Sequence, residues 1–191
     1  MISARSLDLH VQQLFNLLER LHSALDKAGI EYRVIGGMAV FLQISARDPD
    51  AARFTRDVDI AVRREDVDRI AKAAEEFGFR YRHVAGVDML VSAENPKARS
   101  AVHLVFVREK VRAQDLSAIP DFSEPTRTVE GFLLAPVADL VRMKLTSFRL
   151  KDKTHIIDMD SVGLIPPEIE AGLPEPLRQR LKQVRDEERG E

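Results

Sequence analysis

The stretch that decides the fold runs from Val34-Ile35-Gly36-Gly37 to Thr55-Arg56-Asp57-Val58-Asp59-Ile60. The apolar residues of 32–35 predict a short strand that ends at the glycine pair. A short helix is expected over 38–44, and the polar segment 46–54 contains a proline and predicts a loop. A second strand then brings in two aspartates. Strand, glycine pair, helix, loop and Asp-x-Asp strand in this order are far more informative than either motif alone.

The two aspartates predict a metal site. Side chains two residues apart on a strand point to the same face, so Asp57 and Asp59 are expected to present their carboxylates side by side. Two such carboxylates repel each other, and a divalent cation removes that repulsion. Oxygen ligands suit Mg²⁺, which commonly binds one or two carboxylates together with substrate phosphates. We therefore expect Asp57 and Asp59 to bind Mg²⁺ or Mn²⁺.

The glycine pair predicts a phosphate site next to that metal. Glycine allows a close backbone approach, and a helix N-terminus offers free N–H groups and the positive end of its dipole. A triphosphate that lies on Gly36 and Gly37 would be bridged to both aspartates through the metal.

The rest of the chain divides near residue 135. The first part, 1–135, alternates helices and strands; the second, 136–191, is helical. The pattern predicts a mixed α/β (α+β) fold, a mixed sheet with flanking helices, with the C-terminal helical region packed on it. Helices are expected over 7–28 and 65–77, strands over 79–84, 87–92 and 101–107, a loop around Asn95 and Pro96, a surface loop over 108–125, two short extended pieces within 126–134, and helices from 136, 166 and 176 onward.

Composition excludes several classes of function. The 191 residues contain no cysteine, so disulfides, zinc-thiolate sites and cysteine nucleophiles are excluded. A formal net charge of -2 predicts no strong field for nucleic acid or membrane, although basic residues gather between 142 and 153. With no signal-like or membrane-spanning stretch either, we expect a cytoplasmic protein without a membrane partner.

These residues resemble the signature of the nucleotidyltransferase superfamily, in which an apolar residue and a Gly-Gly or Gly-Ser pair precede a hydrophobic-flanked Asp-x-Asp. The subgroup that the chain looks most similar to is that of the minimal and AbiEii-like enzymes, several of which act as toxins beside an antitoxin. Leu140-Val141-Arg142-Met143-Lys144-Leu145, with Arg149-Leu150-Lys151-Asp152 and Asp158, extends the resemblance into the helical region. It implies that Thr55, Lys144 and Lys151 bind the nucleotide with the glycine pair.

The chain departs from the family pattern at the third carboxylate. The strand 101–107 has His103 where the family has its acid. Asp88 has the right local pattern but comes one strand earlier. We expect His103 to face the same cleft as Asp57 and Asp59, as a metal ligand, a general base or a hydrogen-bonding residue.

The resemblance implies a metal-dependent enzyme that moves a nucleoside monophosphate from a nucleoside triphosphate to an acceptor. A tRNA end or other RNA, a protein hydroxyl and a small antibiotic are all compatible with the sequence. Two alternatives stay open: a catalytically degenerate nucleotide-binding module, and an interaction protein that is one member of a toxin–antitoxin pair. Label transfer from a nucleoside triphosphate separates the enzyme from both, and nucleotide binding without transfer identifies the module.

Overall fold

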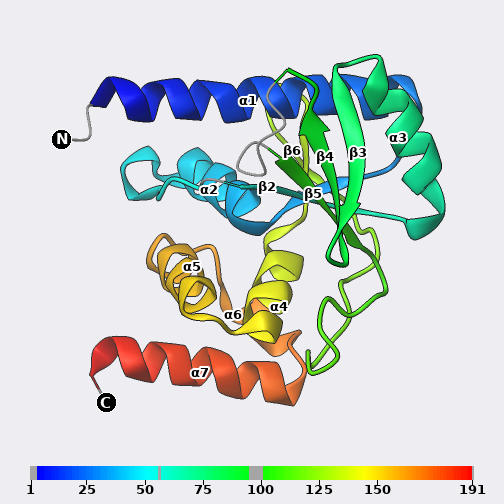
Figure 1. Cartoon of the computed structure of the whole chain (residues 1–191). Helices are drawn as coiled ribbons and strands as arrows, with labels where there is room; N and C mark the ends of the chain where they lie inside the picture. The colour runs from blue at the N-terminus through cyan, green and yellow to red at the C-terminus, as the bar shows by residue number, and fades with distance from the viewer. Residues whose placement is uncertain (1–3, 56, 95–100, 191) are drawn as a thin grey trace.

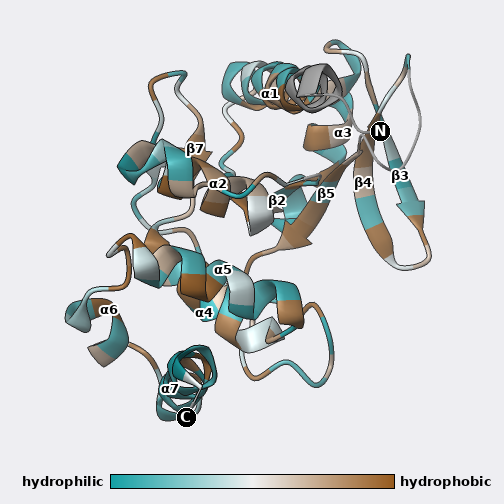
Figure 2. Cartoon of the chain, turned by 90° about the vertical axis from the view of Figure 1, so that its left-hand side faces the viewer, coloured by the Kyte–Doolittle hydropathy of each residue, from teal (hydrophilic) through white to brown (hydrophobic). Residues whose placement is uncertain are grey.

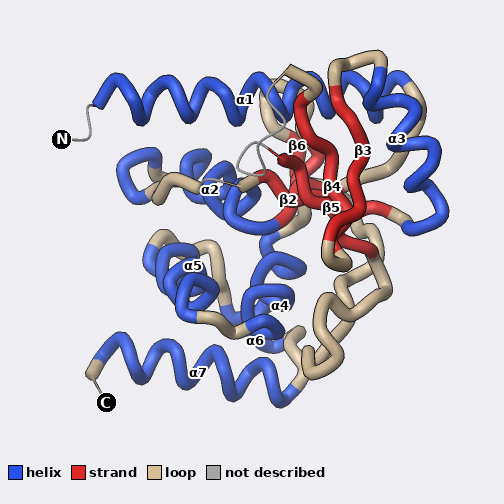
Figure 3. Tube along the Cα trace, viewed as in Figure 1, coloured by secondary structure: helices blue, strands red, loops and turns tan. Residues whose placement is uncertain are grey.

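The computed structural model describes residues 4–55, 57–94 and 101–190. Within these ranges the chain forms one seven-stranded mixed sheet, helices beside it and a C-terminal group of helices (Figures 1 and 3). The elements in chain order are α1 (Ala4–Lys27), β1 (Arg33–Ile35), α2 (Gly36–Arg47), η1 (Pro49–Ala51), β2 (Val58–Val62), η2 (Arg64–Asp66), α3 (Val67–Glu75), β3 (Phe79–Val84), β4 (Val87–Ser92), β5 (Ala101–Phe106), β6 (Thr126–Arg127), β7 (Leu133–Leu134), α4 (Val137–Ser147), α5 (Leu150–Ser161), α6 (Pro167–Ala171) and α7 (Glu175–Arg189). The expected mixed α/β fold with a C-terminal helical region is confirmed.

In the sheet, β2 lies between β5, which carries His103, and β1, which leads into the glycine pair. The strand order of the sheet is β3-β4-β5-β2-β1-β7-β6. β2 pairs antiparallel with β1 and parallel with β5. In this register Asp59 lies opposite Ile35 on one side and His103 on the other. Residues far apart in the sequence therefore meet on neighbouring strands.

Helices cover the sheet on both sides. α1 and α3 lie on one side, while α2 packs against β1 and β2, α4 and α5 pack against α2, and α7 packs against α4 and α5 (Figures 1 and 2). The apolar stripe of α1 is fully buried at Leu18, Leu21 and Leu25. In the C-terminal region, Leu140 and Leu145 of α4 are fully buried in the same continuous core. Burial of this apolar surface is the main favourable term that holds the helices to the sheet.

Several boundaries differ from the predictions. The helix expected over 38–44 extends from Gly36 to Arg47, so part of the expected loop 46–54 is helical. Asp57 precedes β2 and does not lie on it, because pairing with β1 and β5 begins only at Asp59 and Val58. The helical pattern after 136 is interrupted at Phe148, whose φ of 49° is left-handed and ends α4 before α5. The loop expected around Asn95 and Pro96 lies outside the described residues.

In the described part of the chain, no helix combines the length and apolar character needed to cross a membrane. The longest, α1, has 24 residues, and its apolar side chains form one stripe that faces the core.

Candidate active site

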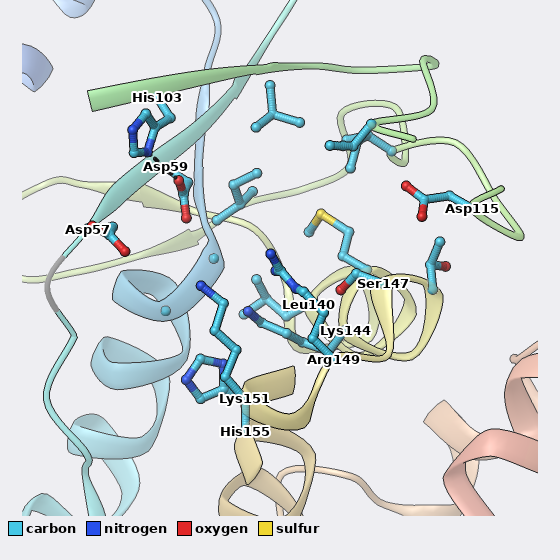
Figure 4. A pocket seen from close by; sticks show the side chains of 18 of the residues that line it. Asp57, Asp59, His103, Asp115, Leu140, Lys144, Ser147, Arg149, Lys151 and His155 are labelled. Atoms are coloured by element: carbon cyan, nitrogen blue, oxygen red, sulfur yellow. Dashed lines mark hydrogen bonds and ion pairs between the residues drawn. The ribbon is translucent and has the colours of Figure 1, made fainter. Parts of the chain in front are cut away.

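A cavity of about 600 Å³ opens between the sheet, α4, α5 and the loop 108–125 (Figure 4). This volume suits a nucleotide-sized ligand. Every residue predicted for the site lines it. The predicted residues among its walls are Gly36, Gly37, Thr55, Asp57, Asp59, His103, Lys144 and Lys151.

The first wall is the junction of β1 and α2 with the two aspartates. Gly36 has a φ of +69°, a left-handed conformation that favours glycine. A Cβ atom on Gly36 would also collide with the carboxylate of Asp59. Asp59 thus packs against the backbone at the start of α2, and only glycine permits both the turn and this approach. Asp57 and Asp59 are both partly exposed to the cavity.

Gly37 is enclosed from another direction. A Cβ atom there would lie 2.5 Å from Thr55 Oγ1 and 3.6 Å from Cε1 of His155. The sequence signature therefore places Thr55 directly against the glycine pair. This arrangement leaves the backbone at the N-terminus of α2 close to the cavity, where its N–H groups have no partners within the helix.

His103 faces the aspartates, as expected from its register. Its Nδ1 lies 3.1 Å from Oδ1 of Asp59. The hydrogen bond to Asp59, together with the charges of Asp59 and Asp57, raises the pKa of His103 despite partial burial. The imidazolium form is therefore favoured relative to a free histidine, and in this state the ring donates to Asp59.

Asp88 does not belong to the site. It lies opposite Leu104 in the β4–β5 register, whereas Met89 lies opposite His103. Because neighbouring residues of a strand face opposite sides of the sheet, Asp88 faces away from His103. Its carboxylate accepts hydrogen bonds from Tyr81 and His83. Of the two alternatives for the third-acid position, the structure therefore places His103 and not Asp88 beside Asp59.

The opposite wall is basic and is supplied by α4 and α5. Lys144 is buried, and its Nζ lies 3.2 Å from Oδ1 of Asp152. Burial lowers the pKa of Lys144, and the charge of Asp152 opposes that effect. Asp152 is fully buried and accepts further hydrogen bonds from Ser147 Oγ at 2.6 Å and from Arg149 Nε at 2.7 Å. Burial alone would raise the pKa of Asp152, but Arg149 and Lys144 hold it well below its usual range.

Asp152 therefore has a local structural role and is not itself presented to a ligand. It joins the end of α4 to the first turn of α5, where its carboxylate also accepts from the backbone N–H of Arg149. Asp158, the other acid of the predicted motif, pairs with Arg53 at 3.0 Å. Lys151 is the exposed lysine of this wall, and its side chain extends from α5 into the cavity in Figure 4.

Two groups of pocket residues were missed from the sequence. His155 lies one helical turn after Lys151, and residues four apart share a helix face, so this spacing was a usable signal. The loop 108–125 was expected only to be a surface loop, yet Val111, Asp115 and Ile119 line the cavity. No local pattern predicts this, because the position of the loop depends on residues distant in sequence, as in the hydrogen bond that Arg33 Nη2 donates to Ser123 O at 2.6 Å.

The donor set suits a divalent cation that also binds phosphate. Asp57 and Asp59 offer oxygen ligands, but in the described residues no group of three or more His, Asp or Glu side chains is arranged to hold a metal ion. Mg²⁺ tolerates such an incomplete protein site, because it keeps waters and takes further ligands from phosphates. The residues therefore fit a metal that is shared with a nucleotide better than a metal held by protein alone.

Comparisons with known proteins agree with this geometry. A family model described as "Uncharacterised nucleotidyltransferase" matches residues 3–136. An antigenic nucleotidyltransferase-like protein from Paracoccidioides brasiliensis has a similar fold, with a TM-score of 0.59 and 22% identity over 94% of this chain and 89% of that one. The antibiotic-resistance factor ANT(2'')-Ia aligns over 95% of this chain and 93% of its own at 13% identity, with a TM-score of 0.46. No functionally curated protein matches the chain.

Proposed function

The chain belongs to the family of uncharacterised nucleotidyltransferases, and from this premise we propose that it transfers a nucleoside monophosphate from a nucleoside triphosphate to an acceptor. The bond between the α-phosphorus and the bridging oxygen to the β-phosphorus would break, and pyrophosphate would leave. One observation carries the proposal. A single cavity brings together the aspartate pair, the partly exposed Gly36 and Gly37, and the cations Lys144 and Lys151.

The charge distribution of this cavity supports a polyphosphate ligand. Carboxylates line the sheet side, and cations line the helix side (Figure 4). A triphosphate between them would contact Lys151 and the N-terminus of α2 directly. It would meet Asp57 and Asp59 through a divalent cation, Mg²⁺ or Mn²⁺. That ion, when bound, would neutralise charge on the phosphates and lower the pKa of the attacking hydroxyl.

His103 is proposed to act on the acceptor side. It stands next to Asp59 in the position where the family has a third acid. In its neutral form, the imidazole would take the proton of the attacking acceptor hydroxyl as the new phosphorus–oxygen bond forms. His103 would therefore contribute to transfer without being needed for nucleotide binding.

The direct test compares wild type with the Asp57→Asn/Asp59→Asn double variant. We expect the wild type to bind Mg²⁺ together with a nucleoside triphosphate, and to transfer an α-phosphate label to an acceptor in pools of tRNA, protein and aminoglycosides. The double variant should lose both properties. Asp66→Asn/Asp68→Asn is a matched control, because it makes the same charge change at the same spacing in η2 and α3, outside the cavity. Equal metal binding by both proteins, or binding by neither with nucleotide present, would refute the metal assignment.

A nucleotide-binding module without transferase activity is the second candidate, and His103 is the observation that favours it. A third acid at this position would help to bind a metal ion. His103 instead donates a hydrogen bond to Asp59, which stabilises the carboxylate when no metal is bound. Nucleotide binding without label transfer to any acceptor pool would support this candidate. The AbiEii-like subtype, a toxin role with an antitoxin partner, and an RNA acceptor remain predictions; label transfer to tRNA would favour the toxin-type enzymes among them.

A further inference from the structure

His155 lines the cavity beside Gly37, at the end where the proposed function places the phosphates. Its Cε1 is the ring atom that comes within 3.6 Å of where a Cβ on Gly37 would stand. Its Nδ1 is buried, and no described residue offers it a hydrogen bond. Buried polar atoms are nearly always paired in folded proteins, so an unpaired nitrogen in a side chain that lines a cavity indicates a partner that the ligand-bound protein supplies, with a small turn of the ring.

The charges around His155 are predominantly positive. Lys144 acts on it from α4, Arg149 from the N-cap of its own helix α5, and Lys151 and the acid Asp152 from the first turn of that helix. The carboxylate of Asp152 is already occupied by Lys144, Ser147 and Arg149. From α2, Gly37 comes close to the ring, and it has no titratable group. Burial first, and then the charge of Lys144, lowers the pKa of His155 to about 4, so its ring is neutral near pH 7.

We propose that His155 is a ligand of the nucleotide's polyphosphate and takes up one proton from solvent when that polyphosphate binds. This inference rests on the proposed function, since it assigns the same cavity to a triphosphate. The geometry supplies the reason. Polyphosphate oxygens accept hydrogen bonds and cannot donate them once fully ionised, so an imidazole against them is satisfied best when both nitrogens carry protons.

The proton uptake has a defined pH signature. A phosphate charge within hydrogen-bonding distance raises a neighbouring pKa by about 1–3 units. At the upper end this would bring the pKa of bound His155 from about 4 to about 7. The contribution of His155 to polyphosphate affinity would then be about tenfold at pH 6 and nearly absent at pH 8.

The experiment uses inorganic tripolyphosphate with Mg²⁺ as the probe and the full-length protein. Nitrogen-15 NMR of the imidazole rings reports the protonation of His155 with and without the probe at pH 6.5. Titration calorimetry at pH 6 and pH 8 gives the affinity and, in buffers of different ionisation enthalpy, the proton count. His155→Gln removes the titrating group and identifies its signals. His83→Gln is the matched control, because His83 lies in β3, outside the cavity.

We expect a neutral His155 ring that becomes protonated on binding, and a wild-type advantage over His155→Gln of about tenfold at pH 6 that disappears at pH 8. His83→Gln should behave like wild type. Binding with a ring that stays neutral, or equal affinities of wild type and His155→Gln at pH 6, would overturn this inference and leave the proposed function intact. Proton uptake on binding without label transfer would support the polyphosphate site and count against the transferase. A folded wild type that binds neither tripolyphosphate nor nucleotide would overturn both.

Discussion

Replacing Asp152 by asparagine should destabilise the protein strongly, because this one carboxylate compensates a buried cation. Asp152 is fully buried, and the side chain of Lys144 is only 7% exposed. Arg149, which is 44% exposed, can turn toward water when the carboxylate charge is lost, but Lys144 cannot. Removing one partner of a buried pair leaves an uncompensated charge and typically costs about 3–5 kcal/mol. Asparagine keeps an oxygen acceptor, so the lower end, about 3 kcal/mol, is expected for Asp152→Asn.

Equilibrium urea unfolding followed by circular dichroism measures this loss. With an m-value of about 1–3 kcal/mol per molar urea, a loss of about 3 kcal/mol moves the midpoint by about 1 M or more. Glu187→Gln is the control, because it breaks a pair with Lys153 that is similar in length, 2.8 Å, but lies at the surface. Exposed pairs contribute about 0–1 kcal/mol, so its midpoint should hardly move.

The pH dependence adds a second check on Asp152. Its pKa is lowered in the folded protein, so its contribution is fully present above the unfolded pKa of about 4 and is lost as pH falls below it. The difference between wild type and Asp152→Asn should be constant from pH 5 to pH 8 and should narrow below about pH 4. A loss at pH 7 no larger than that of Glu187→Gln would refute the reasoning that Lys144 depends on this carboxylate.

Three further outcomes are expected from the site. Gly37→Val should weaken nucleoside triphosphate binding at least about tenfold by calorimetry without unfolding the protein, because its side chain would displace Thr55 and crowd the phosphates, a misfit of about 1–3 kcal/mol; normal binding by a stable variant would contradict this. His103→Ala should lower label transfer about 100-fold if His103 is the base and leave nucleotide binding unchanged, whereas His103→Asp should maintain or raise transfer; an unchanged rate in His103→Ala would reduce His103 to a packing role. Because the pKa of His155 is lowered to about 4, the folded protein resists its protonation, and the free energy of unfolding should fall by at most about 3 kcal/mol as pH drops from about 6.5 to 4. In urea unfolding, His155→Gln should lose less stability than wild type over this pH range, by the same amount, and identical pH profiles of the two proteins would exclude the effect.

The local parts of the fold were predictable because they depend on neighbours in sequence. The glycine pair at the start of a helix, the strand at 58–62 and the short pieces within 126–134 all appear where the pattern predicted them. The apolar period after 136 predicted helix correctly but missed its interruption at Phe148. That break follows from the left-handed backbone at this residue, and a non-glycine residue gives no sequence signal for such a conformation.

The position of His103 shows what a sequence can and cannot decide about the site. The alternation of side chains along 101–107 puts His103 on the opposite face of the strand from Val102 and Leu104. Which of the two faces lies toward the aspartates depends on the strand that pairs with it. The parallel pairing of β5 with β2 decides this, since it sets His103 directly opposite Asp59. The same pairing decides against Asp88, which is one strand further from β2 and one residue out of register. A third-acid position is thus a property of strand order, which no local motif encodes.

For the basic wall, the resemblance predicts that Lys144 and Lys151 both bind the nucleotide, but the structure gives these two lysines different surroundings. Lys144 and Lys151 both line the cavity, yet Lys144 is buried against Asp152 and Lys151 is exposed. Burial of an ion pair is unfavourable unless its remaining hydrogen bonds are satisfied, and Ser147 and Arg149 satisfy those of Asp152. Lys144 is therefore held in the cavity wall by its pair with Asp152, whereas the exposed side chain of Lys151 is not buried in such a pair. Under the proposed function, a polyphosphate would therefore be met mainly by Lys151, because Asp152 already compensates the charge of Lys144.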